Sequence, residues 1–264
     1  MSRSLAPVLS CLVALNATAA EEIVTLPTRP GVTQSYLLSV PPADKPQAVA
    51  VLFPGGAGRV NLVREQQREA LDRGNFLVRS RRLFAEAGVA VAVLDAPSDQ
   101  TSGMEDDFRL GADHAADISE VIKDLRSRQP GLPVFLIGTS RGTISAANAG
   151  ARLRDQVNGV VLTATVFLSA RRAGRPGLSG FDFGSIAAPL LLVHHVEDAC
   201  YVTPYPEART LAERYPLISV SGGSPPRSGP CQAMSYHGFL GKESETVDEI
   251  VKWMLKRPFR RKID

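Results

Sequence analysis

The sequence predicts an α/β protein with a mostly parallel sheet of about eight strands and helices on both faces. Short, continuously apolar segments typical of strands buried on both faces alternate with segments of helical periodicity along most of the chain. A glycine-rich turn at 138–142 joins one such strand directly to a helix. The 264 residues contain no internal repeat, linker or low-complexity tract, so we expect a single domain.

The first 19 residues predict a secretory signal peptide rather than a buried N-terminal helix. Arg3 gives the positive start, residues 5–15 are apolar, and Ala17-Thr18-Ala19 matches a cleavage pattern. Cleavage after Ala19 would leave residues 20–264 as the mature domain of a periplasmic or secreted protein. No other segment reaches the ~18 apolar residues of a membrane span. The formal net charge of +3 predicts no nucleic-acid partner.

The expected strands start with two short antiparallel segments and continue with buried, parallel ones. They are residues 22–26, 35–40, 48–53, 89–94, 133–137, 160–164, 189–193 and 217–220. Helices are expected within 59–80, over 81–87, after Asp113, after 142, over 204–215 and after Ser244. Asp113 and Ser244 are expected to be the N-caps of their helices.

The turn at 138–142 reads G-T-S-R-G and has the strand–turn–helix context of a nucleophile elbow. Such a turn is so sharp that the residues two before and two after the serine nearly touch. Only small residues fit there, and Gly138 and Gly142 meet this need. The pattern therefore predicts Ser140 as an exposed nucleophile, held in a strained conformation at the sheet edge.

A serine hydroxyl is a weak nucleophile and needs a base, for which the chain offers four histidines. His114 lies in the first turn of a helix, where a surface position is expected. His194 and His195 end a strand, so at least one should point into the core. His237 lies in the loop between the last strand and the last helix, which returns to the edge that carries Ser140. We therefore expect His237 to be the base.

The base needs a carboxylate that fixes its tautomer and stabilises its cation. Asp198 follows a buried strand at the same edge of the sheet, with Glu197 as the second choice and Asp95 as the third. The chain order Ser140, Asp198, His237 is that of one large fold family and differs from both common serine-protease orders.

An oxyanion hole needs two converging backbone N–H groups. One is expected from Arg141, which follows the nucleophile, and the other from the glycine-rich loop after strand 48–53. Gly56 is the first choice in that loop, and Gly55 and Ala57 stay open.

These residues resemble the α/β-hydrolase-fold serine hydrolases, of the small exported bacterial kind, over about 49–255. The resemblance implies a Ser140–Asp198–His237 triad and hydrolysis through an acyl-enzyme. We expect no large cap domain, no cofactor and no metal. Segments 75–80 and 95–99, with the cysteine pair, are similar to one group of that family, which implies no particular substrate. Many esterases have a histidine before the glycines, whereas this chain has Phe53-Pro54.

Cys200 and Cys231 remain after removal of the signal peptide, which carries the third cysteine. An even count in an exported protein favours a disulfide over two buried thiols. Cys200 lies two residues after the expected acid and Cys231 six before the expected base. Both loops must reach one edge of the sheet, so the two sulfurs are expected to meet.

The favoured function is hydrolysis of small carboxylic esters, with a peptidase or amidase, or a non-catalytic binding protein, as alternatives. Residues 167–184 are too short for a full cap, so we expect an open, shallow site. Arginines could favour an anionic acyl group, although a solvated basic surface is the preferred interpretation. They are Arg59, Arg64, Arg171, Arg172 and Arg175.

Overall fold

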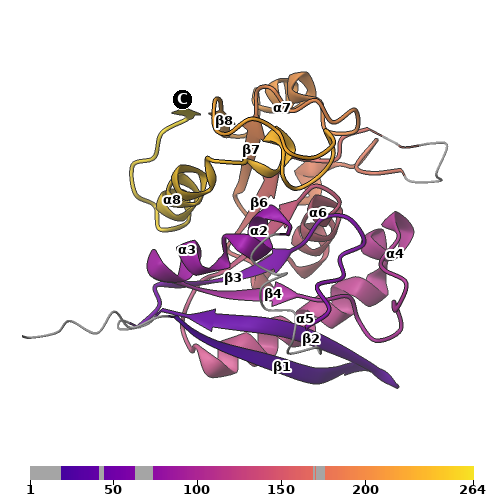
Figure 1. Cartoon of the computed structure of the whole chain (residues 1–264). Helices are drawn as coiled ribbons and strands as arrows, with labels where there is room; N and C mark the ends of the chain where they lie inside the picture. The colour runs from indigo at the N-terminus through magenta and orange to yellow at the C-terminus, as the bar shows by residue number, and fades with distance from the viewer. Residues whose placement is uncertain (1–18, 42–44, 63–73, 169, 171–175) are drawn as a thin grey trace, which may run out of the picture.

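A computed structural model describes residues 19–41, 45–62, 74–168, 170 and 176–264 (Figure 1). Within them, one nine-stranded sheet has the order β1-β2-β4-β3-β5-β6-β7-β8-β9. The strands are β1 (Ala20–Arg29), β2 (Val32–Val40), β3 (Ala48–Phe53), β4 (Val89–Leu94), β5 (Val134–Thr139), β6 (Gly159–Thr163), β7 (Leu190–His195), β8 (Leu217–Val220) and β9 (Lys262–Ile263).

The sheet combines an antiparallel start with a parallel body. β1 pairs antiparallel with β2, and β2 antiparallel with β4. Every later pair, from β4·β3 through β8·β9, is parallel. This confirms the predicted fold class, with one strand more than expected.

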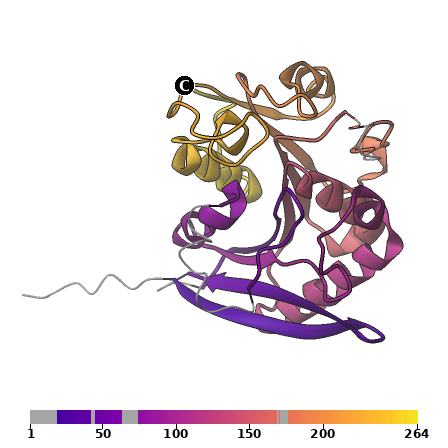
Figure 2. The same cartoon turned by 45° about the vertical axis from the view of Figure 1, so that its right-hand side comes forward.

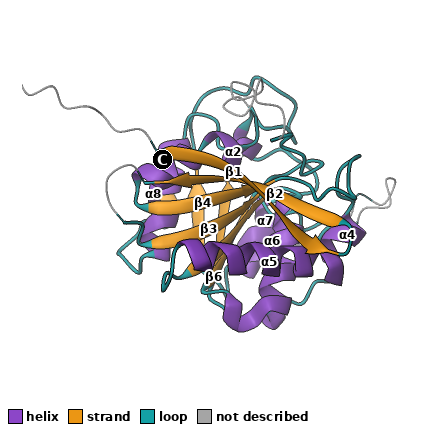
Figure 3. Ribbon diagram, turned by 90° about the horizontal axis from the view of Figure 1, so that it is seen from below, coloured by secondary structure: helices purple, strands orange, loops and turns teal. Residues whose placement is uncertain are grey.

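Helices cover both faces of the sheet (Figures 2 and 3). One face packs against α2 (Phe76–Arg79), α3 (Arg81–Glu86) and α8 (Glu243–Met254). The other packs against α5 (Ala112–Arg128), α6 (Gly142–Leu153) and α7 (Tyr205–Leu211), with α4 (Asp106–Leu110) beside α5 and α6. The described residues also include three short 3₁₀ helices, η2 (Arg154–Gln156), η4 (Phe183–Ser185) and η5 (Tyr236–Gly238). The described residues contain no large cap domain.

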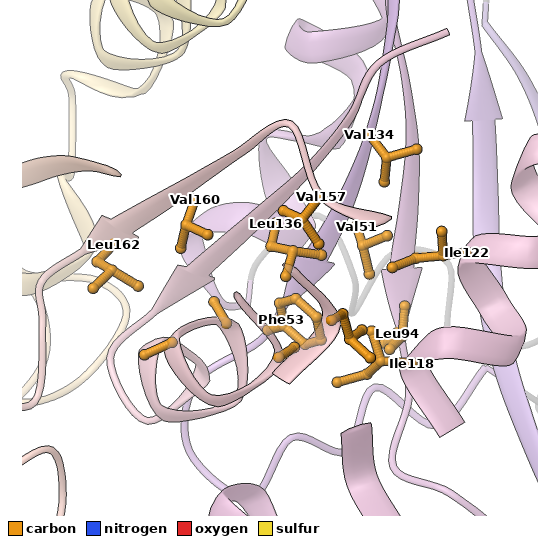
Figure 4. Close-up of a cluster of buried hydrophobic side chains, with 14 of the residues drawn as sticks. Val51, Phe53, Leu94, Ile118, Ile122, Val134, Leu136, Val157, Val160 and Leu162 are labelled. Atoms are coloured by element: carbon orange, nitrogen blue, oxygen red, sulfur yellow. The ribbon is translucent and has the colours of Figure 1, made fainter. Parts of the chain in front are cut away.

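Alternate residues of each central strand enter opposite cores. In β3, Val51 and Phe53 face α5 and α6, whereas Ala50 and Leu52 face the α3 and α8 side. Figure 4 shows the first of these cores, where side chains from the sheet meet Ile118 and Ile122 of α5. Full burial of a side chain of this size contributes roughly 1.5–3 kcal/mol to the free energy of unfolding. Because the parallel strands are packed on both faces, they form a rigid edge for the site.

The basic C-terminal tail forms β9, which was not predicted. Ile263 pairs with Val220 of β8 and is buried. Glu249 of α8 is fully buried and accepts hydrogen bonds from the backbone N–H and Nε of Arg260. A two-residue strand has no periodicity to detect, and its position depends on this contact with a distant helix.

Two expected helix caps are wrong. α5 begins at Ala112 with Gly111 as its N-cap, and α8 begins at Glu243 with Lys242 as its N-cap. Asp113 therefore lies in the first turn of α5, where a negative charge favours the helix dipole without capping it.

The predicted signal peptide falls almost entirely on residues 1–18, which lie outside the described residues, so it stays a prediction. β1 begins at Ala20, directly after the predicted cleavage site. Among the described helices, none is long and apolar enough to cross a membrane.

Candidate active site

Ser140 stands in the sharp turn between β5 and α6, as predicted. Its φ of 52° places a non-glycine residue in the left-handed region, which is the backbone strain expected of such a turn. The Ser140 N–H donates to the carbonyl of Thr163 at 3.0 Å, and the Thr143 hydroxyl donates to the Ser140 carbonyl at 2.6 Å. These bonds to β6 and α6 hold the strained residue in place.

The two glycines of the turn are required by close backbone contacts. A Cβ at Gly138 would lie 2.4 Å from the carbonyl oxygen of Gly142, and one at Gly142 would lie 1.9 Å from that of Phe53. Both distances are far inside van der Waals contact. The steric interpretation of the G-x-S-x-G spacing therefore holds for this chain.

His237 lies in η5 and is buried, with 4% of its surface exposed. Its Nδ1 donates to Asp198 Oδ2 at 2.9 Å. Its Nε2 is buried and has no hydrogen-bond partner among the described residues. A Cβ at the next residue, Gly238, would lie 1.9 Å from the carbonyl oxygen of Ala233, so glycine is needed for the tight loop that presents the imidazole.

Asp198 is held by three donors. Its Oδ2 accepts from His237 Nδ1 and from the Thr203 hydroxyl, both at 2.9 Å, and its Oδ1 accepts from the Cys200 N–H at 2.9 Å. Burial would raise the pKa of Asp198, but the hydrogen bond and charge of His237, with the other donors, lower it below its ordinary value. Asp198 therefore contributes to stability at neutral pH, and this contribution is lost as the pH falls through the lowered pKa.

Thr203 was not singled out from the sequence. Its hydroxyl also lies 3.3 Å from His237 Nδ1, so it contacts both members of the pair. A threonine five residues after an aspartate has no distinctive spacing, and its role depends on how the loop after β7 folds.

The alternative acids are placed elsewhere. Glu197 is exposed, whereas its neighbour Asp198 is buried. The Asp95 carboxylate accepts from the backbone N–H groups of Val60 and Leu62, at 2.7 and 2.9 Å, and so fixes the loop after β3.

The other three histidines are all buried. His114 is 1% exposed, so its predicted surface position is wrong. It lies beside the rings of Phe53 and Phe108, and burial lowers its pKa to about 3. His194 donates from Nε2 to the carbonyl of Thr203, and His195 donates from Nε2 to the carbonyl of Gly222.

The expected oxyanion donors lie beside Ser140. Neither the Arg141 nor the Gly56 N–H makes a hydrogen bond within the described part of the chain. Gly56 has a φ of 60°, which glycine adopts without strain. A Cβ at Gly55 would lie 2.9 Å from the Cβ of Ser140, so this loop approaches the serine as closely as its glycines allow.

Two guanidinium groups donate hydrogen bonds to the Gly56 carbonyl. These contacts were not predicted from the sequence. Arg109 donates to it from Nη2 at 3.2 Å and Arg141 from Nη1 at 3.3 Å. Arg141 also pairs with Asp106 at 2.6 Å, whereas Arg109 is fully buried and donates to Ser145 Oγ. Burial, and then the positive charge of Arg141, lower the pKa of Arg109 to about 9. Burial of one guanidinium group beside another costs folding free energy. Ionisable groups with pKa values shifted in this way are typical of functional sites.

Two cavities meet at Ser140. The first, of about 290 Å³, is lined by His237, Asn75 and Gln232, among others. The second, of about 230 Å³, is lined by Arg141, Val166, Leu168 and Tyr201, among others. Both also include Gly56, Ser140 and Cys231. A larger cavity of about 1030 Å³, lined by Pro133 and Pro189 among others, lies where the strands begin, at the opposite edge of the sheet.

Comparisons with known proteins agree with this fold. The sequence model of the family described as "Serine aminopeptidase, S33" matches residues 72–227. The chain belongs to this family. No protein of curated function matches the chain in sequence.

Solved structures share the α/β-hydrolase fold of this S33-family chain. Est1E from Butyrivibrio proteoclasticus has a TM-score of 0.62 and 14% identity, over 89% of this chain and 98% of that chain. The esterase domain of a Rhodothermus marinus protein has a TM-score of 0.58 and 17% identity, over 90% and 99%. XC6422 from Xanthomonas campestris, described as a serine hydrolase without lid, has a TM-score of 0.56 and 15% identity, over 88% and 95%.

Cys200 and Cys231 form a disulfide in this S33-family chain, as predicted. Cys200 is buried beside Asp198, and Cys231 lines both cavities at Ser140. The bond therefore joins the loop that carries the predicted acid to the loop that carries the predicted base.

Reduction of this disulfide is expected to lower both the melting temperature and kcat, with a smaller effect on KM. Closing a loop of about 30 residues stabilises a domain by roughly 3–4 kcal/mol on the chain-entropy model. For a domain of this size that corresponds to a melting-temperature shift on the order of 10 °C. Calorimetry and steady-state kinetics of native and reduced protein measure both effects. Two titratable thiols in denatured, unreduced protein from its native compartment would contradict the prediction.

Proposed function

We propose that this serine hydrolase cleaves carboxylic esters through an acyl-enzyme formed on Ser140. One observation carries the proposal: the unpartnered Nε2 of His237, whose Nδ1 is bonded to Asp198, belongs to the same cavity as Ser140. A buried imidazole nitrogen without a partner is costly unless it has a use. Acceptance of the serine proton is that use.

Each residue of the proposed site has its own role in the reaction. Ser140 Oγ attacks the ester carbonyl carbon while His237 Nε2 takes its proton, and Asp198 stabilises the imidazolium. The N–H groups of Arg141 and Gly56 bind the oxyanion of the tetrahedral intermediate. His237 then returns the proton to the departing alkoxide. Water, activated by the same nitrogen, attacks the acyl-enzyme and regenerates Ser140.

Aminopeptidase activity is the second candidate, because the family description names it. Such a site needs a carboxylate available to the free amino group of the substrate. Among the described lining of both cavities, Asp106 is the one carboxylate, and it already accepts from Arg141 and from the Gly177 N–H. This engagement, with three esterase-named structural neighbours, favours esters over aminoacyl amides.

Labelling by a fluorophosphonate probe, followed by a panel of esters and aminoacyl amides, tests the proposal. We expect labelling at Ser140 and faster turnover of esters. Absence of labelling would favour a non-catalytic binding protein, and faster turnover of aminoacyl amides would favour the peptidase.

The site would act outside the cytoplasm. The predicted signal peptide and the disulfide between Cys200 and Cys231 both support export to the periplasm or the medium.

Arg109→Met is expected to lower kcat about tenfold to a hundredfold with KM changed less than twofold. Loss of an oxyanion donor costs about 10²–10³ in kcat, and loss of one of the two groups that hold Gly56 should cost part of this. Methionine fills the buried site, and Arg109→Lys should restore part of the rate. Steady-state kinetics of each variant provides the measurement.

Arg126→Met is the matched control, because Arg126 also donates to a backbone carbonyl, that of Gln156, but on the surface of α5. An Arg109→Met protein with native kcat and native melting temperature would show that the Gly56 contact does not position the oxyanion donor.

A further inference from the structure

The two cavities at Ser140 are lined by different side chains. They share Gly56, Ser140 and Cys231, so the serine and the disulfide stand between them. His237 lines only the first cavity, and the side chain of Tyr201 lines only the second. An ester bound with its carbonyl carbon at Ser140 extends one part into each cavity.

The position of His237 decides which part enters which cavity. Its Nε2 must return a proton to the departing alkoxide oxygen, which requires hydrogen-bond distance. The first cavity, which contains His237, is therefore the side of the alcohol. The second cavity, on the Arg141 side, receives the acyl group.

The acyl side is largely apolar. Val166 is buried there, and Leu168 and Tyr201 are among the few large apolar side chains that are exposed, at 41% and 71%. Exposed apolar side chains gathered at a cavity indicate a binding surface for apolar groups. Arg141, the one arginine in its described lining, pairs with Asp106 at 2.6 Å and with Glu105 at 3.0 Å, so it does not select an anionic acid.

Of the expected arginine cluster, only Arg59 lies among the described residues. Arg59 donates to Asn61 and lines a separate cavity beside Asp95. Arg64, Arg171, Arg172 and Arg175 lie outside the described residues.

The lining of the alcohol side includes two side-chain amides, Asn75 and Gln232. Asn75 Oδ1 accepts from the Leu77 N–H, and Gln232 Oε1 accepts from the Gly229 N–H. The Nδ2 of Asn75 and the Nε2 of Gln232 make no hydrogen bond within the described part of the chain. Apart from His237, the described lining has no ionisable side chain. Neutral donors without a carboxylate or a cation suit hydroxyl groups.

We propose that the substrates are esters of a short apolar acid with a polyol or sugar-like alcohol. The inference rests on the proposed ester hydrolysis and adds its substrate class. The acyl cavity, at about 230 Å³, has the volume of about eight water molecules, which is enough for a short acyl chain.

Two ester series test the proposal with purified, disulfide-bonded protein. In the first, glyceryl monobutyrate is compared with propyl butyrate, each rate divided by its rate of alkaline hydrolysis. We expect kcat/KM to favour the glyceryl ester by about tenfold. In the second, 4-nitrophenyl butyrate should exceed the acetate by about tenfold, because each buried CH₂ contributes roughly fourfold at full burial. The hemisuccinate should be slower than the butyrate.

Variants then assign the preferences to the two cavities. Gln232→Leu and Asn75→Ser should each lower the glyceryl-to-propyl ratio about threefold to tenfold; serine keeps the N-cap of α2. Leu168→Ser and Tyr201→Ser should lower the butyrate-to-acetate ratio instead. Gln129→Leu, at the end of α5 on the opposite edge of the sheet, is the control and should leave both ratios unchanged.

The outcomes separate this inference from the function on which it rests. Hydrolysis that favours propyl over glyceryl esters, or acetate over butyrate, overturns the inference and leaves ester hydrolysis intact. The cavity assignment is wrong if the Gln232 and Asn75 variants keep the glyceryl-to-propyl ratio, or if the Leu168 and Tyr201 variants keep the butyrate-to-acetate ratio. Failure of every ester, together with failure of the fluorophosphonate probe to label Ser140, refutes the proposed function itself.

Discussion

Ser140→Ala is expected to lower kcat for ester hydrolysis by about 10⁶-fold, because loss of the serine in such a triad removes the acyl-enzyme route. The fold should persist. Alanine keeps the Cβ that packs against Gly55, and the backbone bonds to Thr163 and Thr143 do not involve the serine hydroxyl. The same change should abolish fluorophosphonate labelling. Single-turnover and steady-state kinetics on a reactive ester, together with thermal unfolding, provide the measurements.

Ser127→Ala is the control for this variant. Ser127 lies exposed on α5, so its replacement should change neither turnover nor melting temperature. An Ser140→Ala protein with turnover within tenfold of the native rate would mean that another residue is the nucleophile.

Sequence patterns predicted the central sheet because its strands are buried on both faces. Segments such as 48–53 and 89–94 are apolar at every position, and all of their residues are buried in the structure. Ser140 and His237 could be placed for a related reason. The carboxyl ends of parallel strands share one edge of the sheet, so residues that follow those strands meet there.

Contacts made by ordinary residues across long stretches of chain were not predictable. Arg109 reaches Gly56 from 53 residues away, and Thr203 contacts His237 from 34 residues away. Neither belongs to a motif, and each is placed by loops whose course has no periodic signal. His114 is an example of a wrong prediction with the same cause. Its position in the first turn of a helix indicated the surface, but contacts with the rings of Phe53 and Phe108 bury it in the core.

Asp198→Asn is expected to lower kcat by about 10⁴-fold with little change in KM. The carboxylate accepts from His237 Nδ1 and thereby leaves Nε2 free to take the serine proton. An asparagine amide in that position donates instead, so it favours the tautomer that carries its proton on Nε2. That tautomer cannot act as the base. Steady-state kinetics of the purified variant measures the loss.

Glu197→Gln separates the proposed role of Asp198 from a general loss of negative charge. Both changes remove one carboxylate from the same loop, but Glu197 is exposed and Asp198 is buried against His237 and Thr203. We therefore expect kcat of Glu197→Gln to stay within about twofold of native, since an isolated surface charge contributes little. A larger loss in Glu197→Gln than in Asp198→Asn would assign the orienting carboxylate to Glu197, and the loop after β7 would then have to adopt a different conformation during catalysis.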